Sequence, residues 1–350
     1  MKEVKNKSVV GSVKTFLART AVQDSISYKN LMLFPLITES VIDFEYLTLD
    51  EALRDEQIVI GEVSPEGSVP EFGVRNKGNK PILLIHGEEL RGAKQNRTLN
   101  TDIFVKGRSK IVIPVSCTQQ GRWSYGKEEG VKVHSTEYVS PVKMRSIMSN
   151  SVSTSLEGGK GFASNQGAVW NGVSQGYNAP LGVDSPTQAI DDAFRSRKED
   201  LQKYLDALRP NGWNGMAIVI SGEFVGADLF DSADTLKKLW DKLLRSYALE
   251  ALVKKGESSA FAKKEIEEIL ASAKEAKLKI FKSVSLGYDA RLETPSMVGS
   301  ALVYASRGMN GVVHLSLFRK ETRTGESKAQ GAEMSSARDR GRNWYTRMPE

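Results

Sequence analysis

The chain has 350 residues, of which 40% are hydrophobic, so it can bury a sizeable core as one large domain or as two of ordinary size. Its 49 lysines and arginines exceed its 43 acidic residues by only six, which indicates an anionic small-molecule partner rather than a dedicated nucleic-acid binder. A single cysteine excludes an internal disulfide and a cysteine-based zinc cluster, and no apolar run approaches the roughly 20 residues of a membrane span, so we expect a cytoplasmic protein without a membrane partner.

The first third of the chain is rich in predicted strands. Aliphatic runs separated by Gly, Asn, Pro and charged turns cover residues 31–37, 57–63, 80–86 and 109–117. The third run contains ILLI, which is apolar on both alternating faces, as a central strand would be. The fourth contains Pro114, whose missing N–H suits an edge strand or a bulge better than the middle of a sheet.

The composition changes between about residues 145 and 183 to Ser, Gly, Asn and Gln. Little in this stretch suggests a core, so we expect a long flexible loop. A loop of this length in a compact domain is usually mobile or functional, and Trp170 indicates that part of it docks.

A helix-start pattern opens the next segment. Asp184 or Ser185 can cap a helix and Pro186 suits its first turn, and the apolar spacing that follows predicts a helix over residues 186–208. The same reasoning predicts a strand at residues 215–221, an amphipathic helix at 232–255 and a charged helix at 258–277. Three strand-like runs follow, at residues 278–287, 299–306 and 311–318.

This order of elements predicts an α+β fold, with strand-rich N-terminal and C-terminal portions and helices concentrated at about 186–275. We expect residues 1–318 to form a single large domain that carries the flexible loop. Residues 319–350 are polar and basic, so we expect a tail that is at least partly disordered.

Standard catalytic signatures are absent from the sequence, including a Gly-rich loop ending in Lys-Ser/Thr, a Gly-x-Ser-x-Gly elbow and a His-Glu-x-x-His motif. The nearest metal-like cluster is His86 with Glu88 and Glu89. In an extended strand the two glutamates would point to opposite sides, and His86 would share a side with Glu88 only. We therefore assign no metal ligand, and keep Mg²⁺ as the cofactor that such carboxylates would favour. The structural alternative is a capped turn with solvated acids.

The segment CTQQGR, from Cys117 to Arg122, invites comparison with the loop of the cysteine phosphatases. That loop places five residues between Cys and Arg, whereas four intervene here. Strand alternation also puts the thiol on an apolar face, where it behaves as a small buried hydrophobe, with Ile111, Ile113 and Val115. A nucleophilic role for Cys117 is therefore weighed against a place in the core.

Two blocks resemble a known family. The segment GEELRGAKQNR from Gly87 to Arg97, and PVSC followed by GRW from Pro114 to Trp123, resemble the ARG and rhodanese-phosphatase superfamily-associated protein domain family. The early NLMLFPLI, NQGAVWNGV near Trp170, SPTQAIDDAF and GEFVGADLFDS are also similar to it, so that the resemblance covers most of the chain up to about residue 255.

The initials ARG stand for ADP-ribosylglycohydrolase, with which this family is linked by gene neighbourhood and domain fusion. The resemblance implies an α+β domain that acts in the metabolism of NAD and ADP-ribose derivatives. Two positions depart from the family's pattern: an acidic residue is expected where Thr118 stands, and often an Asp where Asn165 stands. Because one fold hosts many functions, the reaction must be argued from the site.

We predict that segments 87–100 and 116–123 converge as loop ends beside paired strands and bind a phosphate-bearing small molecule or nucleotide. Lys94, Arg97 and Arg122 would hold phosphate oxygens, the arginines with a planar fork of donors. Trp123 or Trp170 would stack on a base. The amides that would read ribose hydroxyls or a base are Gln95, Asn96, Asn100 and Gln119.

Glu88 or Glu89 would be the general acid or base, provided that burial or a neighbour tunes its pKa, and Cys117 is the third candidate catalytic residue. This inventory fits hydrolysis or transfer at a glycosidic or phosphoester bond. One alternative is a scaffold, in which Arg97 and Arg122 pair with the two glutamates in a buried network. Another is a non-catalytic module that binds or senses a nucleotide for a partner enzyme.

A third interpretation is an RNA- or partner-binding protein that uses the basic tail and the Ser/Gly/Asn-rich loop. The sequence holds no basic motif interleaved with aromatic residues, so nucleic acid is only weakly supported as a partner.

Overall fold

The structure is a computed structural model that describes residues 2–39, 41–125, 132–257, 259–306 and 309–320. Its strands pair antiparallel with one exception and its helices pack on them, which confirms the predicted α+β class. The helices are α1 (Lys2–Ala18), α2 (Leu49–Arg54), α3 (Val142–Glu157), α4 (Gln166–Asn171), the π-helix η1 (Gly172–Asn178), α5 (Ile190–Ser196), α6 (Lys198–Ala207), α7 (Ala233–Lys254) and α8 (Lys263–Glu275). The strands are β1 (Ala21–Val22), β2 (Ile26–Tyr28), β3 (Leu31–Ile37), β4 (Leu47–Thr48), β5 (Ile58–Gly61), β6 (Glu71–Asn76), β7 (Ile82–Leu84), β8 (Glu88–Gly92), β9 (Arg97–Leu99), β10 (Ile103–Val105), β11 (Ser109–Cys117), β12 (Val133–Val139), β13 (Gly215–Ile220), β14 (Glu223–Phe230), β15 (Lys277–Lys282), β16 (Tyr288–Glu293), β17 (Met297–Ser306) and β18 (Met309–Arg319).

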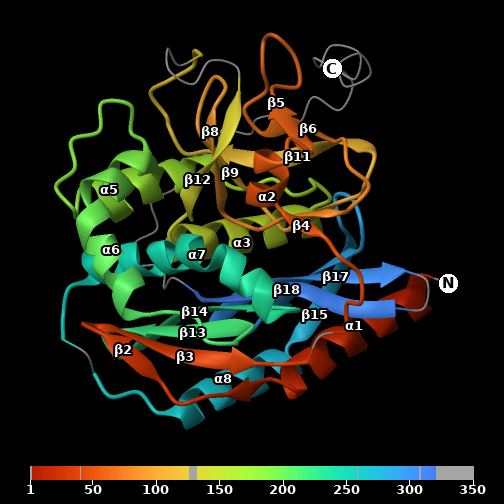
Figure 1. Cartoon of the computed structure of the whole chain (residues 1–350), viewed down its shortest axis with the longest axis vertical. Helices are drawn as coiled ribbons and strands as arrows, with labels where there is room; N and C mark the ends of the chain where they lie inside the picture. Colours follow the sequence, from red (N-terminus) through yellow and green to blue (C-terminus); the bar gives the residue numbers. More distant parts are fainter. Residues whose placement is uncertain (1, 40, 126–131, 258, 307–308, 321–350) are drawn as a thin grey trace.

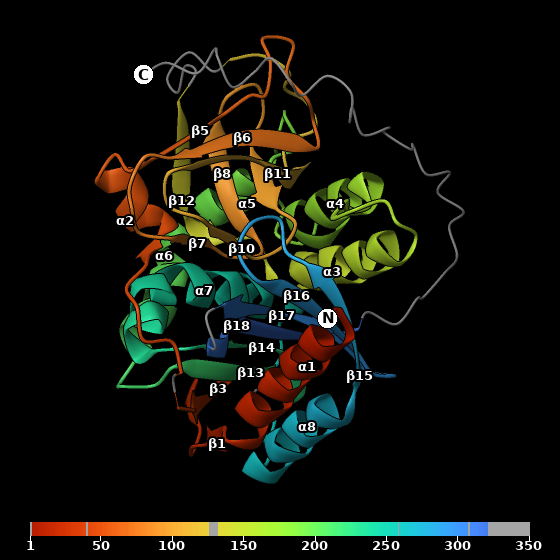
Figure 2. The ribbon, with the colours of Figure 1, turned by 90° about the vertical axis from the view of Figure 1, so that its right-hand side faces the viewer.

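A nine-stranded sheet forms the lower half of the molecule as drawn in Figure 1. Its order is β1-β3-β13-β14-β18-β17-β16-β15, with β2 also paired to β3. Side chains alternate between its two faces, so that on β3 Leu31 and Leu33 enter one hydrophobic cluster while Phe34 and Leu36 enter another. Helices α1 and α8 cover one face and α3 and α7 the other, as Figure 2 shows from the side.

A smaller strand-rich unit lies on the α3 and α7 side of this sheet (Figure 1). It consists of a six-stranded sheet, β12-β8-β9-β11-β6-β5, and a three-stranded sheet, β10-β7-β4. Together with α2 they enclose a third hydrophobic cluster. Strand β7, which carries the ILLI run, is the middle strand of its sheet, as predicted.

Strand β11 changes its partner at Pro114. Residues 109–114 pair with β6, and residues 115–117 pair with β9. The prediction of an edge strand is therefore wrong, because β11 lies inside the six-stranded sheet. The proline is tolerated there because it stands where one ladder ends and the next begins.

The expected flexible loop at 145–183 is wrong as a description of secondary structure, since α3, α4 and η1 occupy most of it. The segment does dock, as Trp170 indicated: the side chain of Gln166 on α4 donates to the carbonyl of Cys117 at 2.7 Å and accepts from its N–H at 2.8 Å. Helix α3 has a buried apolar stripe with a spacing of four residues, formed by Met144, Met148, Val152 and Leu156.

Helices are also less confined to residues 186–275 than predicted. Besides α3, α4 and η1, helix α1 lies near the N-terminus and buries one face against the large sheet. The predicted helix at 186–208 starts later and is divided at Arg197 into α5 and α6. Ser185 does accept a hydrogen bond from a later N–H, that of Ala189 at 2.8 Å, but within a turn that precedes α5.

Residues 321–350, which make up nearly all of the predicted tail, lie outside the described residues. Among the helices that are described, none combines the length and the apolarity needed to cross a bilayer.

Candidate functional site

The two predicted blocks lie side by side. The first forms the hairpin of β8 and β9, and the second is the end of β11 with the turn that follows it. The N–H of Thr118 donates to the carbonyl of Asn96 at 3.0 Å, and the Gln95 amide donates to the carbonyl of Gln119 at 3.2 Å. The structure therefore brings together the segments that carry the predicted ligand-binding residues.

Arg97 is held by the protein itself. Its guanidinium donates two hydrogen bonds of 3.0 Å to the carboxylate of Glu62 and one of 3.1 Å to the carbonyl of Glu71, and it lies 4.1 Å from the ring centroid of Phe72. The side chain is fully buried, and this burial lowers its pKa although Glu62 opposes the effect. These contacts favour the buried-network alternative for Arg97, but with Glu62 in place of Glu88 or Glu89.

Arg122 binds the two blocks to each other. Its Nε donates to Gln119 Oε1 at 2.8 Å, one terminal nitrogen donates to Asn96 Oδ1 at 3.1 Å, and the other donates to the carbonyl of Ala93 at 2.9 Å. The side chain is half-buried. Three of the predicted ligand-binding residues, Asn96, Gln119 and Arg122, thus form one polar cluster.

The remaining predicted amides are buried as well. Asn100 donates from Nδ2 to the carbonyl of Phe162 at 3.0 Å and accepts from the hydroxyl of Ser116 at 2.6 Å, so it fixes the segment before α4. Gln95 Oε1 has no hydrogen-bond partner among the described residues. Trp170 is half-buried next to Cys117, and its indole lowers the pKa of the Cys117 thiol against the larger effect of burial.

Glu88 and Glu89 point to opposite sides of β8, as the extended chain predicted. The carboxylate of Glu88 accepts from the ammonium of Lys242 on α7 at 3.0 Å and from the N–H of Ile85 at 2.9 Å. Lys242 also donates to Asp50 at 2.7 Å, and these two carboxylates raise its pKa although burial opposes them. Glu88 therefore belongs to a buried ion pair.

Glu89 has a different environment. It is fully buried, and its carboxylate accepts hydrogen bonds from the hydroxyls of Thr118 and Ser140. No lysine or arginine among the described residues forms an ion pair with it. Burial raises the pKa of Glu89 to about 8, although the bonds from Thr118 and Ser140 lower it.

A second acidic group lies near Glu89 and adds to this effect. Asp191 on α5 accepts from the hydroxyl of Tyr138 at 2.6 Å and pairs with Arg195 at 2.7 Å and Arg91 at 3.7 Å. Its negative charge raises the pKa of Glu89 further. With a pKa of about 8, Glu89 is protonated near neutral pH and can act as a general acid. Burial raises the pKa of Glu88 as well, but Lys242 opposes this effect.

Cys117 lies in the core, as the strand alternation indicated. Its thiol is fully buried and donates to the carbonyl of Gln119 at 3.2 Å. Burial raises the pKa of the thiol, which is the opposite of what a nucleophilic cysteine requires. Within the described residues no three His, Cys, Asp or Glu side chains are grouped as metal ligands, so Mg²⁺ stays a prediction.

Lys94 and two aromatic residues form the exposed part of the region. Trp123 and Tyr125 are 46% and 41% exposed, and the Lys94 ammonium lies 5.4 Å and 5.8 Å from their ring centroids. The same ammonium donates to the carbonyl of Glu66 at 2.8 Å, which fixes the lysine. We call this surface, made of Lys94, Trp123 and Tyr125, the aromatic platform. Tyr125 was not among the predicted residues.

A buried charged network between the large sheet and the smaller unit was not predicted from the sequence. Asp228 on β14 accepts two hydrogen bonds from Arg145 on α3, at 2.6 Å and 2.9 Å, and one of 2.7 Å from Tyr247 on α7. His314 on β18 lies between Asp228, at 3.1 Å, and Asp102, at 3.0 Å. These residues are up to 212 positions apart, so no local spacing links them.

The chain was compared with known proteins. Searches of curated proteins and of solved structures found no match. Residues 19–318 match the family model described as ARG and Rhodanese-Phosphatase-superfamily-associated Protein domain. The matched range includes the predicted segments 87–100 and 116–123, the whole smaller unit and most of the large sheet. Because the match spans most of its length, the chain belongs to the family of ARG and rhodanese-phosphatase-superfamily-associated protein domains.

Proposed function

We propose that this domain binds a phosphate-bearing nucleotide of the ADP-ribose or NAD class at the aromatic platform. The observation that carries the proposal is the pair of exposed rings, Trp123 and Tyr125, with the Lys94 ammonium close to both. Exposed rings offer faces on which a base stacks, and a lysine supplies positive charge for a phosphate. The family name, which refers to ARG, supports the choice of this ligand class.

Arg122 adds to the positive charge of this surface. Its guanidinium donates at 2.7 Å to the carbonyl of Ser124, which stands between Trp123 and Tyr125 in the chain, so this charge lies beside the platform. Lys94 and Arg122 are both already oriented by carbonyl oxygens, those of Glu66 and Ala93. Cations that are held in place lose less side-chain entropy when they bind a phosphate.

Hydrolysis or transfer at a glycosidic or phosphoester bond is the second candidate function, and Glu89 favours it. A buried carboxyl group that lacks a cationic partner is suited to donate a proton to a leaving oxygen. Its partner Thr118 is followed within five residues by Trp123, so the acid and the platform share one segment. Both Glu89 and Thr118 are fully buried, however, so catalysis requires this segment to move while binding does not.

Calorimetric titration with ADP-ribose, NAD, AMP and ribose 5-phosphate tests the binding proposal. Trp123→Ala should weaken binding of the ligands that carry a base by about tenfold, because it removes a stacking surface. Lys94→Gln should weaken the binding of all four ligands, and the difference from the wild type should become smaller as salt is added. Lys203→Gln is the matched control, because this substitution also removes one surface charge, at a lysine that pairs with Asp200 on α6. Unchanged affinities in Trp123→Ala and Lys94→Gln would refute the proposal.

Mass spectrometry of the same ligands after incubation tests the catalytic candidate. Product that forms with the wild type and disappears with Glu89→Gln, while ligand binding persists, supports it. Binding at the platform without any product, with and without Mg²⁺, leaves the binding module as the function.

A further inference from the structure

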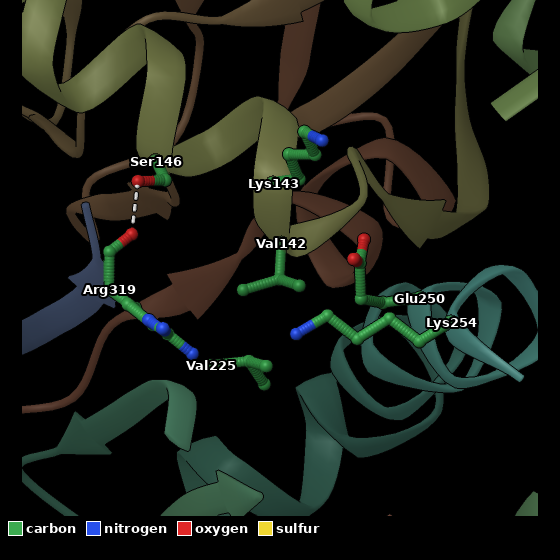
Figure 3. Close-up of a pocket in the computed structure, with 7 residues that line it drawn as sticks. All are labelled: Val142, Lys143, Ser146, Val225, Glu250, Lys254 and Arg319. Carbon is green, nitrogen blue, oxygen red and sulfur yellow. Dashed lines mark hydrogen bonds between the residues drawn. The ribbon is translucent and has the colours of Figure 1, made fainter. Parts of the chain in front are cut away.

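A hollow lies on the side of α3 and α7 that faces the large sheet. The start of α3, the end of α7 and strands β14 and β18 meet there (Figure 3). It has about 270 Å³ of empty space, counted together with the solvent at its mouth. It shares no residue with the predicted site. Its lining residues are Val142, Lys143, Ser146, Val225, Glu250, Lys254 and Arg319.

Two cations converge in this hollow. Figure 3 shows the side chains of Lys254 and Arg319 extending toward each other from α7 and from the end of β18. Both bind the same carboxylate, that of Glu223, at 2.9 Å and 2.7 Å. The hydrogen bonds from Lys254 and Arg319 lower the pKa of Glu223 to about 2, so this carboxylate stays charged between them. The protein itself thus places an anionic group where the two cations meet.

The side chains of Glu223 and Arg319 are 48% and 47% exposed, and that of Lys254 is 29% exposed. Ser146 donates to the carbonyl of Arg319 at 2.8 Å and so anchors the end of β18 to α3. Glu250 is buried and accepts from the hydroxyl of Tyr177, on the π-helix η1, at 2.6 Å. An exposed carboxylate that bridges two cations is readily replaced by another anion, since either anion satisfies the cations.

We propose that this hollow binds a small phosphate-bearing anion, either free phosphate or the phosphate of a phosphomonoester, whose oxygens take the place of the Glu223 carboxylate between Lys254 and Arg319. The guanidinium offers paired donors to phosphate oxygens and the lysine a compact charge. Lys143 on the rim adds a third positive charge. The site is independent of the nucleotide proposed for the aromatic platform.

Competition with Glu223 gives the proposal a distinctive signature. If the ligand takes the place of this carboxylate, Glu223→Gln should bind phosphate about tenfold more tightly, because the internal competitor has lost its charge. The double variant Lys254→Gln/Arg319→Gln should bind at least about tenfold more weakly. A purely structural ion-pair cluster predicts no gain for Glu223→Gln.

Calorimetric titrations of the full chain at constant ionic strength measure these effects, with inorganic phosphate and glycerol phosphate as separate ligands. Tighter binding of glycerol phosphate than of inorganic phosphate identifies a phosphomonoester as the ligand, and the reverse identifies free phosphate. Lys203→Gln is the charge control. Lys94→Gln, which should weaken any phosphate binding at the platform, should leave both affinities unchanged, and this separates the two sites. Melting temperatures check that each variant is folded.

Two outcomes would overturn the proposal. One is that no phosphate binding to the wild type or to Glu223→Gln is detected. The other is binding that Glu223→Gln fails to strengthen or that the double variant fails to weaken. Failure of nucleotides to bind at the platform would not affect either result.

Discussion

Thr118 donates a hydrogen bond from its hydroxyl to the carboxylate of Glu89, a residue 29 positions earlier in the chain. The contact joins the end of β11 to β8 at the back of the predicted site. A neutral hydroxyl stabilises a charged carboxylate less than a cation would, so burial dominates and the pKa of Glu89 rises to about 8.

Replacing Glu89 by Gln should flatten the dependence of stability on pH. Because the pKa of this carboxyl is higher in the folded protein than its ordinary value of 4.5, the wild type loses stability as the pH rises from about 4.5 to about 8. The loss is at most about 5 kcal/mol. Urea unfolding at pH 5, 6, 7 and 8 should show the decline in the wild type and a smaller one in Glu89→Gln. Parallel profiles for the two proteins between pH 5 and 6 would contradict the prediction.

Replacing Arg97 by Ala should destabilise the fold by about 3 kcal/mol, because it leaves the buried carboxylate of Glu62 without its partner. Chemical unfolding measures the effect. The double variant Arg97→Ala/Glu62→Gln should recover part of the loss, since no buried charge then stays unpaired. If Arg97→Ala is fully stable and instead loses nucleotide affinity, Arg97 is a ligand residue and the network interpretation is wrong.

Cys117 should react slowly with a thiol reagent in the folded protein. Its thiol is buried and its pKa is raised, so little thiolate is present and the reagent cannot reach it. Labelling should become fast on adding denaturant. Cys117→Ala should cost about 1 kcal/mol and leave any activity intact. Rapid native labelling, or loss of activity with an intact fold, would restore the nucleophile hypothesis.

His314 should stabilise the protein most at neutral and acidic pH. Burial opposes protonation, but Asp102 and Asp228 prevail and raise the pKa of His314 to about 9. The resulting stabilisation, of the order of 3 kcal/mol, is complete below pH 6.5 and is lost as the pH rises toward 9. Because Glu89 also titrates near pH 8, the comparison is made in the Glu89→Gln background, where His314→Gln should remove the slope between pH 8 and 9. A slope there that survives the substitution would assign it to other groups.

The strands were the most predictable part of the fold. The predicted ranges 31–37 and 109–117 coincide with β3 and β11, because continuous apolar runs bounded by turn residues specify strands locally. Helix α3 was missed because serines dominate its composition, although its buried residues repeat every four positions. For this segment the spacing of the apolar residues predicted the structure better than the composition did. Helix α1 escaped notice for a similar reason, since lysines surround its apolar stripe.

The site was predictable in location and less so in its contacts. The hairpin of β8 and β9 follows from their order in the chain, whereas β11 pairs with β9 across β10, which belongs to the other sheet, so strand order alone did not specify that pairing. The partner of Arg97 did not follow from nearby sequence, because Glu62 is 35 residues away and the glutamates beside Arg97 face elsewhere. The same holds for Lys242, which is 154 residues from Glu88. Long-range ion pairs depend on packing that no local pattern records.

The alternation of β8 has a consequence for how this strand keeps its place. A slip of β8 by one residue in one direction would leave Gly87 opposite Lys242, and a slip in the other direction would leave Leu90 opposite Thr118. Either slip therefore removes a carboxyl group from one of the two positions. The first slip would leave the buried ammonium of Lys242 without Glu88, its buried partner. The ion pair on one side of β8 thus decides which glutamate becomes the uncompensated acid on the other side.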